Sequence, residues 1–246
     1  MASRFEVAFQ FLTAVPLFPA RRFSQEELAR SMAAFPLVGA ALGTGLVAFH
    51  WVAGRFLPPL LEGVVLTGLL AWATGAFHLD GLADTVDGLA GGWTREQALE
   101  IMKDSRTGAV GAAALCLVLL AKAVGLGLLP PGERAWALVG VPVAGRGALV
   151  LVAYGSRYAR SQPGLGTPYT DHLDGGTVAR AVVWTLLACL PLGWKGLAGV
   201  AAVAAYARLV RRGFHRRWGG ITGDVLGFSE ETAEVLFLIV LHAVAS

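Results

Sequence analysis

The sequence is poor in charge and in cysteine, and it lacks the common nucleotide-binding motifs. Only 15% of its 246 residues are charged, whereas soluble domains usually carry about 25%. The two cysteines, Cys116 and Cys189, show no CxxC or Cys/His spacing, so we expect small buried hydrophobic side chains and no metal site. No GxxxxGK[ST] loop and no GxGxxG is present, so a nucleotide would have to be held in another way.

Apolar residues and glycine are abundant in the sequence. Hydrophobic residues make up 55% of the chain, and 32 residues are glycine; small residues allow helices to pack closely in lipid. The composition therefore predicts an all-α integral membrane protein whose main partner is the lipid bilayer. The net charge of +3 is too small, and the basic residues too dispersed, for a nucleic-acid-binding protein. The oligomeric state stays open, a homo-oligomer included.

The apolar segments predict one polytopic domain over residues 1–246, a bundle of about seven transmembrane helices. The expected spans lie near 33–53, 57–77, 108–129, 135–154, 178–193, 196–210 and 232–245. Because a helix needs about 20 residues to cross the hydrocarbon, the last three are individually weak. The stretch 178–210 is either two short spans or one span with a re-entrant piece.

The amino-terminal segment 1–32 is too short and too interrupted to span. Phe5, Phe9 and Leu12 predict the buried side of an amphipathic helix that lies in the membrane interface. Ser24 and Glu27 have the spacing of a capping box, which predicts the start of a short helix.

The basic residues predict the orientation. Of the 20 Lys and Arg residues, only Arg55, Arg134 and Lys195 fall on one side of the predicted membrane, and all but two of the others fall on the opposite side. The positive-inside rule places that richer side, with the amino terminus, in the cytoplasm and the carboxy terminus outside. The segments 78–107, 155–177 and 211–231, interpreted as loops, then share the cytoplasmic side.

The stretch from His78 to Gly108 holds most of the candidate chemistry. Asp80, Asp84 and Asp87 stand at i, i+4 and i+7 and would share one helix face. Carboxylates so placed repel one another unless a cation lies between them, and Mg²⁺ prefers such oxygens together with substrate phosphates. We expect a metal site that Asp104 completes from a second helix, whose start is predicted by the capping box at Thr94.

Several neighbours of this stretch suit phosphate chemistry. Lys103 and Arg106 supply cations for phosphate oxygens, and His78 is a candidate general base or a residue that orients a carboxylate. The competing interpretation is a solvated acidic loop between two apolar helices. The glycines around the aspartates favour close approach of a ligand instead.

A second group of candidates lies near the carboxy terminus. Asp224 is either a helix cap or a further metal ligand, and the glycines around it favour the ligand role. Glu230 is the first-turn glutamate expected to reach the site. The candidate substrate-binding residues here are Gly220, Thr222, Gly223 and Glu230.

The middle of the chain contributes a third group. Tyr158, Arg160, Gly164 and Gly166 are expected to line the mouth of the site, although positive-inside anchoring explains Arg160 equally well. Arg146 falls within a predicted span, where it either binds a substrate phosphate or forms a structural ion pair. Lys122 also falls within a predicted span, where a charge usually faces the bundle interior or a pathway; the alternatives are a misplaced span boundary and a snorkelling side chain.

Four blocks of the sequence resemble one known family. They are His78–Gly88 with Met102–Gly108, Gly219–Gly227, Tyr158–Arg160 followed by Gly164–Gly166, and Phe9–Thr13. Together they resemble the cobalamin synthases, the adenosylcobinamide-GDP ribazoletransferases, over nearly the whole chain. The resemblance implies a bacterial inner-membrane enzyme of cobalamin biosynthesis that transfers the adenosylcobinamide-phosphoryl group from adenosylcobinamide-GDP to α-ribazole or its 5′-phosphate, releasing GMP.

The residues fit this reaction. Mg²⁺ held by the aspartates would bridge diphosphate oxygens, Lys103 and Arg106 would neutralise developing charge, and Asp84, Asp87 or His78 would act on the attacking hydroxyl. Two rivals remain. One is a membrane phosphotransferase of the CDP-alcohol type, whose aspartate-rich motif is loosely similar but differs at Ala83-Asp84. The other is a cation transporter, for which carboxylates near the bilayer midplane between broken helices are expected.

Overall fold

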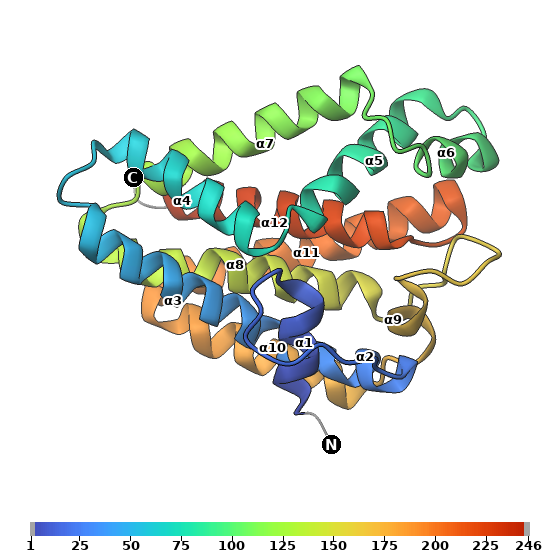
Figure 1. Ribbon diagram of the computed structural model, residues 1–246, viewed down its shortest axis with the longest axis horizontal. Helices are drawn as coiled ribbons and strands as arrows, with labels where there is room; N and C mark the ends of the chain where they lie inside the picture. The colour runs from blue at the N-terminus through green and yellow to red at the C-terminus, as the bar shows by residue number, and fades with distance from the viewer. Residues whose placement is uncertain (1–2, 244–246) are drawn as a thin grey trace.

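The computed structural model describes residues 3–243, and within them the regular secondary structure is helical, apart from one isolated bridge between Tyr158 and Ile221. Figure 1 shows long helices lying side by side, with short helices at one end. The elements are α1 (Arg4–Leu12), α2 (Gln25–Ser31), η1 (Met32–Ala34), α3 (Phe35–Ala53), α4 (Pro59–Ala73), α5 (Phe77–Gly91), α6 (Arg95–Ile101), α7 (Ala109–Gly127), α8 (Pro131–Ala153), α9 (Thr167–Asp171), α10 (Gly175–Cys189), η2 (Leu190–Leu192), α11 (Gly193–Trp218) and α12 (Gly223–Ala243).

The structure agrees with the prediction of a membrane protein, with four candidate spans, or five if a bent helix pair is counted as one. Within residues 3–243, four helical segments are long and apolar enough to cross a bilayer: Gln25–Ala53, Ala109–Gly127, Pro131–Ala153 and Gly175–Trp218. Helices α4 and α5 meet that criterion only as a pair bent by 93°. The expected straight span 57–77 is therefore wrong, because the chain turns after Ala73 through Gly75 and Ala76, both at positive φ.

The stretch 178–210 forms two helices, α10 and α11, which meet at η2 and at Gly193 with φ of 62°, in agreement with the two-helix alternative. Two other boundaries differ from the prediction. The segments 78–107 and 211–231 are mainly helical rather than loops, because the glycines and charges that suggested loops lie on packed helices. Helix α12 consequently begins at Gly223, well before the expected start at 232.

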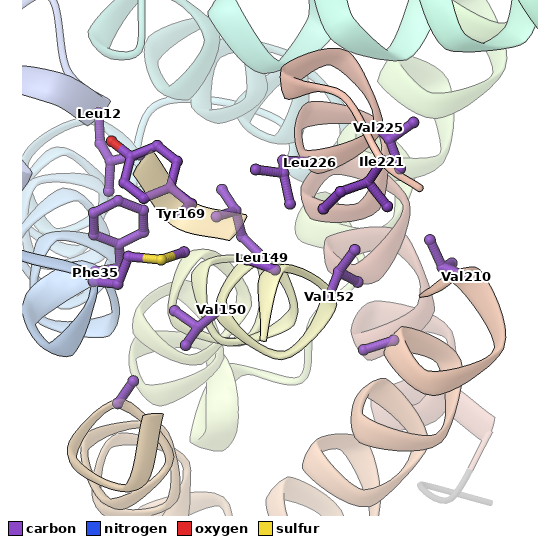
Figure 2. Close-up of a cluster of buried hydrophobic side chains, with 14 of the residues drawn as sticks. Leu12, Phe35, Leu149, Val150, Val152, Tyr169, Val210, Ile221, Val225 and Leu226 are labelled. Carbon is purple, nitrogen blue, oxygen red and sulfur yellow. The ribbon is translucent and has the colours of Figure 1, made fainter. Parts of the chain in front are cut away.

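Helix α8 lies at the centre of the bundle. All but one of the residues from Gly140 to Ala153 are buried, and α8 packs against α3, α10, α11 and α12. Small residues permit this packing, since a Cβ added at Gly39 would lie 2.5 Å from the Pro142 carbonyl oxygen. Figure 2 shows Leu149, Val150 and Val152 of α8 among the buried side chains that join it to its neighbours.

The amino-terminal helix covers one side of this core. Phe9 and Leu12 are buried and Phe5 is half-buried, in line with the expected apolar face of α1. Both predicted capping boxes are present, at Ser24 on α2 and at Thr94 on α6. The cysteine prediction is half wrong: Cys189 is buried, but Cys116 is exposed on the outer face of α7.

The contact between α3 and α8 gives a stability prediction. A Cβ added at Gly43 would lie 2.5 Å from Val139 Cα, so Gly43→Ala must push the two helices apart. We expect a loss of about 1–3 kcal/mol, measured as a lower thermal midpoint of the purified protein in detergent. Gly45→Ala, where the added Cβ meets no atom within 4 Å, is the matched control and should leave the midpoint unchanged or raise it. Equal shifts in both variants would contradict the packing argument.

Candidate functional site

The three segments singled out in the sequence meet at one end of the bundle. Helices α6 and α9 and the first turn of α12 lie together at the right of Figure 1, opposite the α3–α4 connection. The backbone joins two of the segments directly, because the Ala159 amide donates to the Ile221 carbonyl at 2.8 Å and the Ile221 amide donates to the Arg157 carbonyl at 2.9 Å. A Cβ on Gly220 would collide with that Arg157 carbonyl, so glycine is required there.

Helices α5 and α12 cross closely at two glycines. A Cβ at Gly81 would lie 2.8 Å from the Asp224 carbonyl oxygen, and one at Gly227 would lie 2.9 Å from the His78 carbonyl oxygen. Gly81 lies between Asp80 and Asp84, so this crossing brings the Asp224 backbone beside the acidic stretch of α5.

Asp80, Asp84 and Asp224 form an acidic cluster at this crossing. Asp80 and Asp224 both act electrostatically on the half-buried Asp84 carboxylate. Within residues 3–243, neither Asp80 nor Asp84 has a hydrogen-bonded or ion-paired partner for its side chain, whereas Asp224 accepts from Arg160 at 2.8 Å and from Thr222 at 3.1 Å. Two unpaired carboxylates next to a third favour a bound cation.

Asp87 has a different environment from the other aspartates of α5. Its two oxygens accept the backbone N–H groups of Gly108 at 2.7 Å and Gly111 at 2.8 Å, at the start of α7. An added Cβ at either glycine would lie within 2.5 Å of an Asp87 oxygen. Asp87 therefore caps α7 from a neighbouring helix, and its negative charge suits that N-terminus.

Asp104 and Arg106 pair with each other in the exposed connection before α7. The Arg106 guanidinium donates to both Asp104 oxygens, at 2.7 to 3.2 Å, and this hydrogen bonding lowers the pKa of Asp104 to about 2. Both residues line a cavity of about 530 Å³ together with Asp87. Lys103 is exposed and is not among the residues lining that cavity.

The central segment packs against the start of α12. Arg160 donates to Asp224, and Tyr158 lies near enough to both for their charges to act on it. Burial raises the pKa of the Tyr158 phenol, so it stays protonated and can donate. The remaining predicted substrate residues lie at this contact. A Cβ at Gly166 would lie 3.0 Å from the Gly223 amide, and one at Gly164 would meet the Tyr158 hydroxyl. The Thr222 hydroxyl caps α12 by accepting the Val225 amide.

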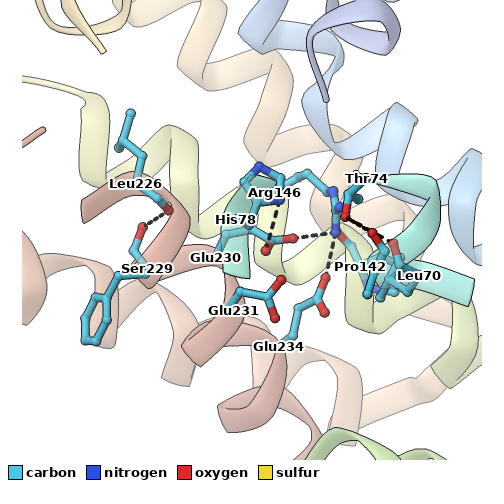
Figure 3. Close-up of polar contacts among 12 residues, drawn as sticks. Leu70, Thr74, His78, Pro142, Arg146, Leu226, Ser229, Glu230, Glu231 and Glu234 are labelled. Atoms are coloured by element: carbon cyan, nitrogen blue, oxygen red, sulfur yellow. Dashed lines mark hydrogen bonds and ion pairs between the residues drawn. The ribbon is translucent and has the colours of Figure 1, made fainter. Parts of the chain in front are cut away.

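A second polar cluster lies inside the bundle, and its members carry charge without access to solvent. Arg146 of α8 contacts Glu230 at 2.5 Å and Glu234 at 2.6 Å, and Lys122 of α7 contacts Glu231 at 2.8 Å and Glu234 at 2.5 Å. His78 of α5 adds a contact to Glu230 at 3.3 Å (Figure 3). All six side chains are buried. We call this set the buried ion network.

The buried ion network decides between the alternatives left open for two residues. Arg146 forms ion pairs with Glu230 and Glu234 and is 1% exposed, which agrees with the structural alternative. Lys122 faces the bundle interior, as expected for a charge within a span, and is neither a boundary residue nor a snorkelling one, since it is 3% exposed and paired. His78 and Glu230 also lie in the network rather than at the solvent-exposed aspartates, which separates them from the other predicted site residues.

Sequence reasoning missed Glu231 and Glu234 as members of this network. The available signal was three glutamates within one turn of an apolar segment, facing two basic residues in other spans. Intramembrane charges pair with one another far more often than they stand alone. Within residues 3–243, His78, Glu230 and Glu231 are the one group of three side chains whose possible metal-ligand atoms all lie within 4.8 Å of one another. Lys122 and Arg146 already supply the positive charge at these glutamates, so a metal ion is not needed there.

Broken helices beside buried carboxylates are also what the transporter interpretation predicts. The bent α4–α5 pair fits that pattern. The three buried glutamates do not act as an open ion site, however, because Lys122 and Arg146 occupy them.

The fold and the site define an all-helical membrane protein with an acidic cluster at one end of its bundle. Residues 4–242 match the family model described as cobalamin-5-phosphate synthase, and the chain belongs to that family. It is 41% identical over 243 residues to the adenosylcobinamide-GDP ribazoletransferase of Syntrophobacter fumaroxidans, covering 97% of both chains. The corresponding protein of Geotalea daltonii is 40% identical over 240 residues, covering 97% of this chain and 96% of its own. No solved structure matches the chain.

The buried ion network yields a second stability prediction. Arg146→Met leaves Glu230 and Glu234 short of a cation in the protein interior, which should cost about 3–5 kcal/mol. Thermal unfolding in detergent measures the loss, and Arg208→Met, at an exposed position of α11, is the control. The double variant Arg146→Met with Glu230→Gln should recover part of the loss because it also removes a buried charge. A single variant as stable as the control would contradict the pairing.

Proposed function

We propose that this protein transfers the adenosylcobinamide-phosphoryl group of adenosylcobinamide-GDP to the ribose 3′-hydroxyl of α-ribazole or its 5′-phosphate. The hydroxyl oxygen forms a bond to the phosphorus that carries the cobinamide, the P–O bond to the second phosphate breaks, and GMP leaves. The product is adenosylcobalamin or its 5′-phosphate. The names of the curated relatives and the matching family support this assignment, and the acidic cluster of Asp80, Asp84 and Asp224 is the observation that supports its location.

The same cluster is the proposed site for Mg²⁺. Asp80, Asp84 and Asp224 offer hard oxygen ligands, and two of them have no other partner in the described chain. Their ligand atoms do not converge within 4.8 Å as those of a tight protein cage would. That spacing suits Mg²⁺, which keeps several waters and takes one or two carboxylates together with substrate phosphates. When bound, the ion would neutralise charge on the diphosphate oxygens.

Protein groups supply the remaining steps of the proposed reaction. Arg160 is held beside the cluster by Asp224 and would bind the diphosphate, with Arg106 as a second cation at the neighbouring cavity. The exposed Asp80 carboxylate would accept the proton of the attacking hydroxyl. Asp87 and Asp104, also predicted as metal ligands, would instead hold the wall of the site, since their oxygens already accept other donors.

We further propose that the end of the bundle carrying the site faces the cytoplasm. The bent α4–α5 pair, counted as one crossing beside α3, α7, α8, α10, α11 and α12, would give seven crossings, with the amino terminus inside and the carboxy terminus outside. The support is the gathering of basic residues near the site, against only three in the described chain at the other end: Arg55 in the α3–α4 connection, Arg134 in the first turn of α8 and Lys195 in the first turn of α11.

Loss of a central carboxylate tests the site. Asp84→Asn should lower GMP release from adenosylcobinamide-GDP and α-ribazole by about 100-fold or more, the scale of removing one electrostatic stabiliser of a transition state. Asp171→Asn, at an exposed aspartate of α9, is the matched control and should keep full turnover. The thermal midpoint of Asp84→Asn should not fall, because the change relieves repulsion from Asp80 and Asp224. Full activity in Asp84→Asn would remove this residue from the site.

Metal removal tests the proposed cofactor. Dialysis of the detergent-purified protein against EDTA should stop GMP release, and added Mg²⁺ should restore it. Parallel assays with CDP-alcohol substrates address the rival phosphotransferase. Release of CMP there, with no GMP from adenosylcobinamide-GDP, would contradict the proposed function, and turnover that survives exhaustive chelation would contradict the metal.

A further inference from the structure

A second polar cavity lies near the carboxyl end of α5, and the proposed reaction uses none of its lining residues. Its volume is about 470 Å³, and its walls include Trp93, Thr94, Arg95, Arg217 and Trp218. The walls thus come from the α5–α6 connection and from the end of α11, two segments far apart in the sequence. An opening of this size, with aromatic and guanidinium groups together, suits a small planar anion-bearing ligand.

Trp93 is the unusual member of this cavity. Its side chain is 94% exposed, although Trp is among the largest apolar side chains and is highly buried on average in folded proteins. It follows Gly91 and Gly92, and a Cβ at Gly92 would lie 2.4 Å from Ala98 atoms on α6, so only glycine brings α5 and α6 this close. An exposed indole at the rim of a cavity offers a flat face on which a nucleobase can stack.

Two guanidinium groups belong to residues that line the same cavity as that indole. Arg217 donates to the Leu89 and Gly92 carbonyls at 3.0 and 3.5 Å, and Arg95 donates to the Ala159 carbonyl at 2.6 Å. Each guanidinium has five N–H donors, so these contacts hold it in place and leave other donors for a ligand. No carboxylate is among the residues that line the cavity, and an anionic ligand is therefore favoured.

The cavity also shares a wall residue with the cavity next to the proposed reaction site. Ala90 lines both this cavity and the one that contains Asp87, Asp104 and Arg106. Ala90 follows Asp84 by six residues, or about 9 Å along a helix axis. On the other side, Arg95 contacts Ala159, next to the Arg160 that pairs with Asp224. The shared wall residue and the Arg95 contact place this cavity beside the proposed reaction site.

From this geometry we infer that the cavity of Trp93, Arg95 and Arg217 binds the guanosine monophosphate part of the donor substrate. The inference rests on the proposed function. The guanine ring stacks on Trp93, and the two guanidinium groups contact the GMP phosphate. The acceptor α-ribazole is also aromatic, but without its 5′-phosphate it carries no anion for Arg95 and Arg217.

Binding of the product GMP tests the assignment without turnover. Equilibrium dialysis of labelled GMP against the full-length protein in detergent gives the Kd, with α-ribazole as the comparison ligand. Trp93→Ala, Arg95→Met and Arg217→Met should each weaken GMP binding about tenfold or more and leave α-ribazole binding unchanged. The controls are Trp51→Ala, at an exposed Trp at the end of α3, and Arg216→Met, at an exposed neighbour outside the cavity. In turnover, the lining variants should raise the KM for adenosylcobinamide-GDP but not that for α-ribazole.

Each other outcome overturns the inference. Wild-type protein that binds no GMP at millimolar concentration, a Trp93→Ala variant with unchanged GMP affinity, or a selective loss of α-ribazole binding would do so. Because Trp93 is exposed, its replacement should not unfold the protein, and the thermal midpoint checks this. If wild-type protein releases GMP from adenosylcobinamide-GDP while the variants bind GMP normally, the cavity assignment fails and the proposed function stands. If wild-type protein releases none, the proposed function itself fails.

Discussion

The buried ion network is the constraint on which the rest of the bundle depends. Burying a charge costs several kcal/mol unless it is paired in good geometry, and here three glutamates, an arginine, a lysine and a histidine come from α5, α7, α8 and α12. Arg146 and Lys122 must meet Glu230, Glu231 and Glu234 for any of them to be tolerated. That requirement fixes the register of α12 against three other helices, in a way that apolar packing alone would specify less strictly.

The network also fixes where the acidic cluster can form. His78 and Glu230 meet inside the bundle, and the glycines Gly81 and Gly227 let α5 and α12 cross beside them. The crossing then brings the Asp224 backbone next to Gly81, between the two unpaired aspartates of α5. Carboxylates that repel one another can be held together only by a scaffold that is stabilised elsewhere, and the paired charges a few turns away stabilise this one.

Much of the architecture follows from sequence patterns, but the site follows only in part. Apolar segments, small residues and capping boxes are local signals, and they give the helical membrane fold, α1 and the starts of α2 and α6. The turn at Gly75, the early start of α12 and the burial of His78 depend on contacts between distant segments. The shared face of Asp80, Asp84 and Asp87 was predictable from helical spacing, whereas the capping of α7 by Asp87 was not, since it depends on where Gly108 and Gly111 lie.

The two acidic clusters differ in partners rather than in residue type, and this difference separates structure from function. Glu231 contacts Lys122, Glu234 contacts Arg146, and both glutamates are buried. A further cation would therefore have to displace the ammonium group of Lys122 or the guanidinium group of Arg146. Asp80 and Asp84 reach solvent and have no such partner in the described chain. Attraction for a mobile cation and a diphosphate therefore concentrates at the end of the bundle, where Arg160 and the neighbouring cavities offer room for a substrate.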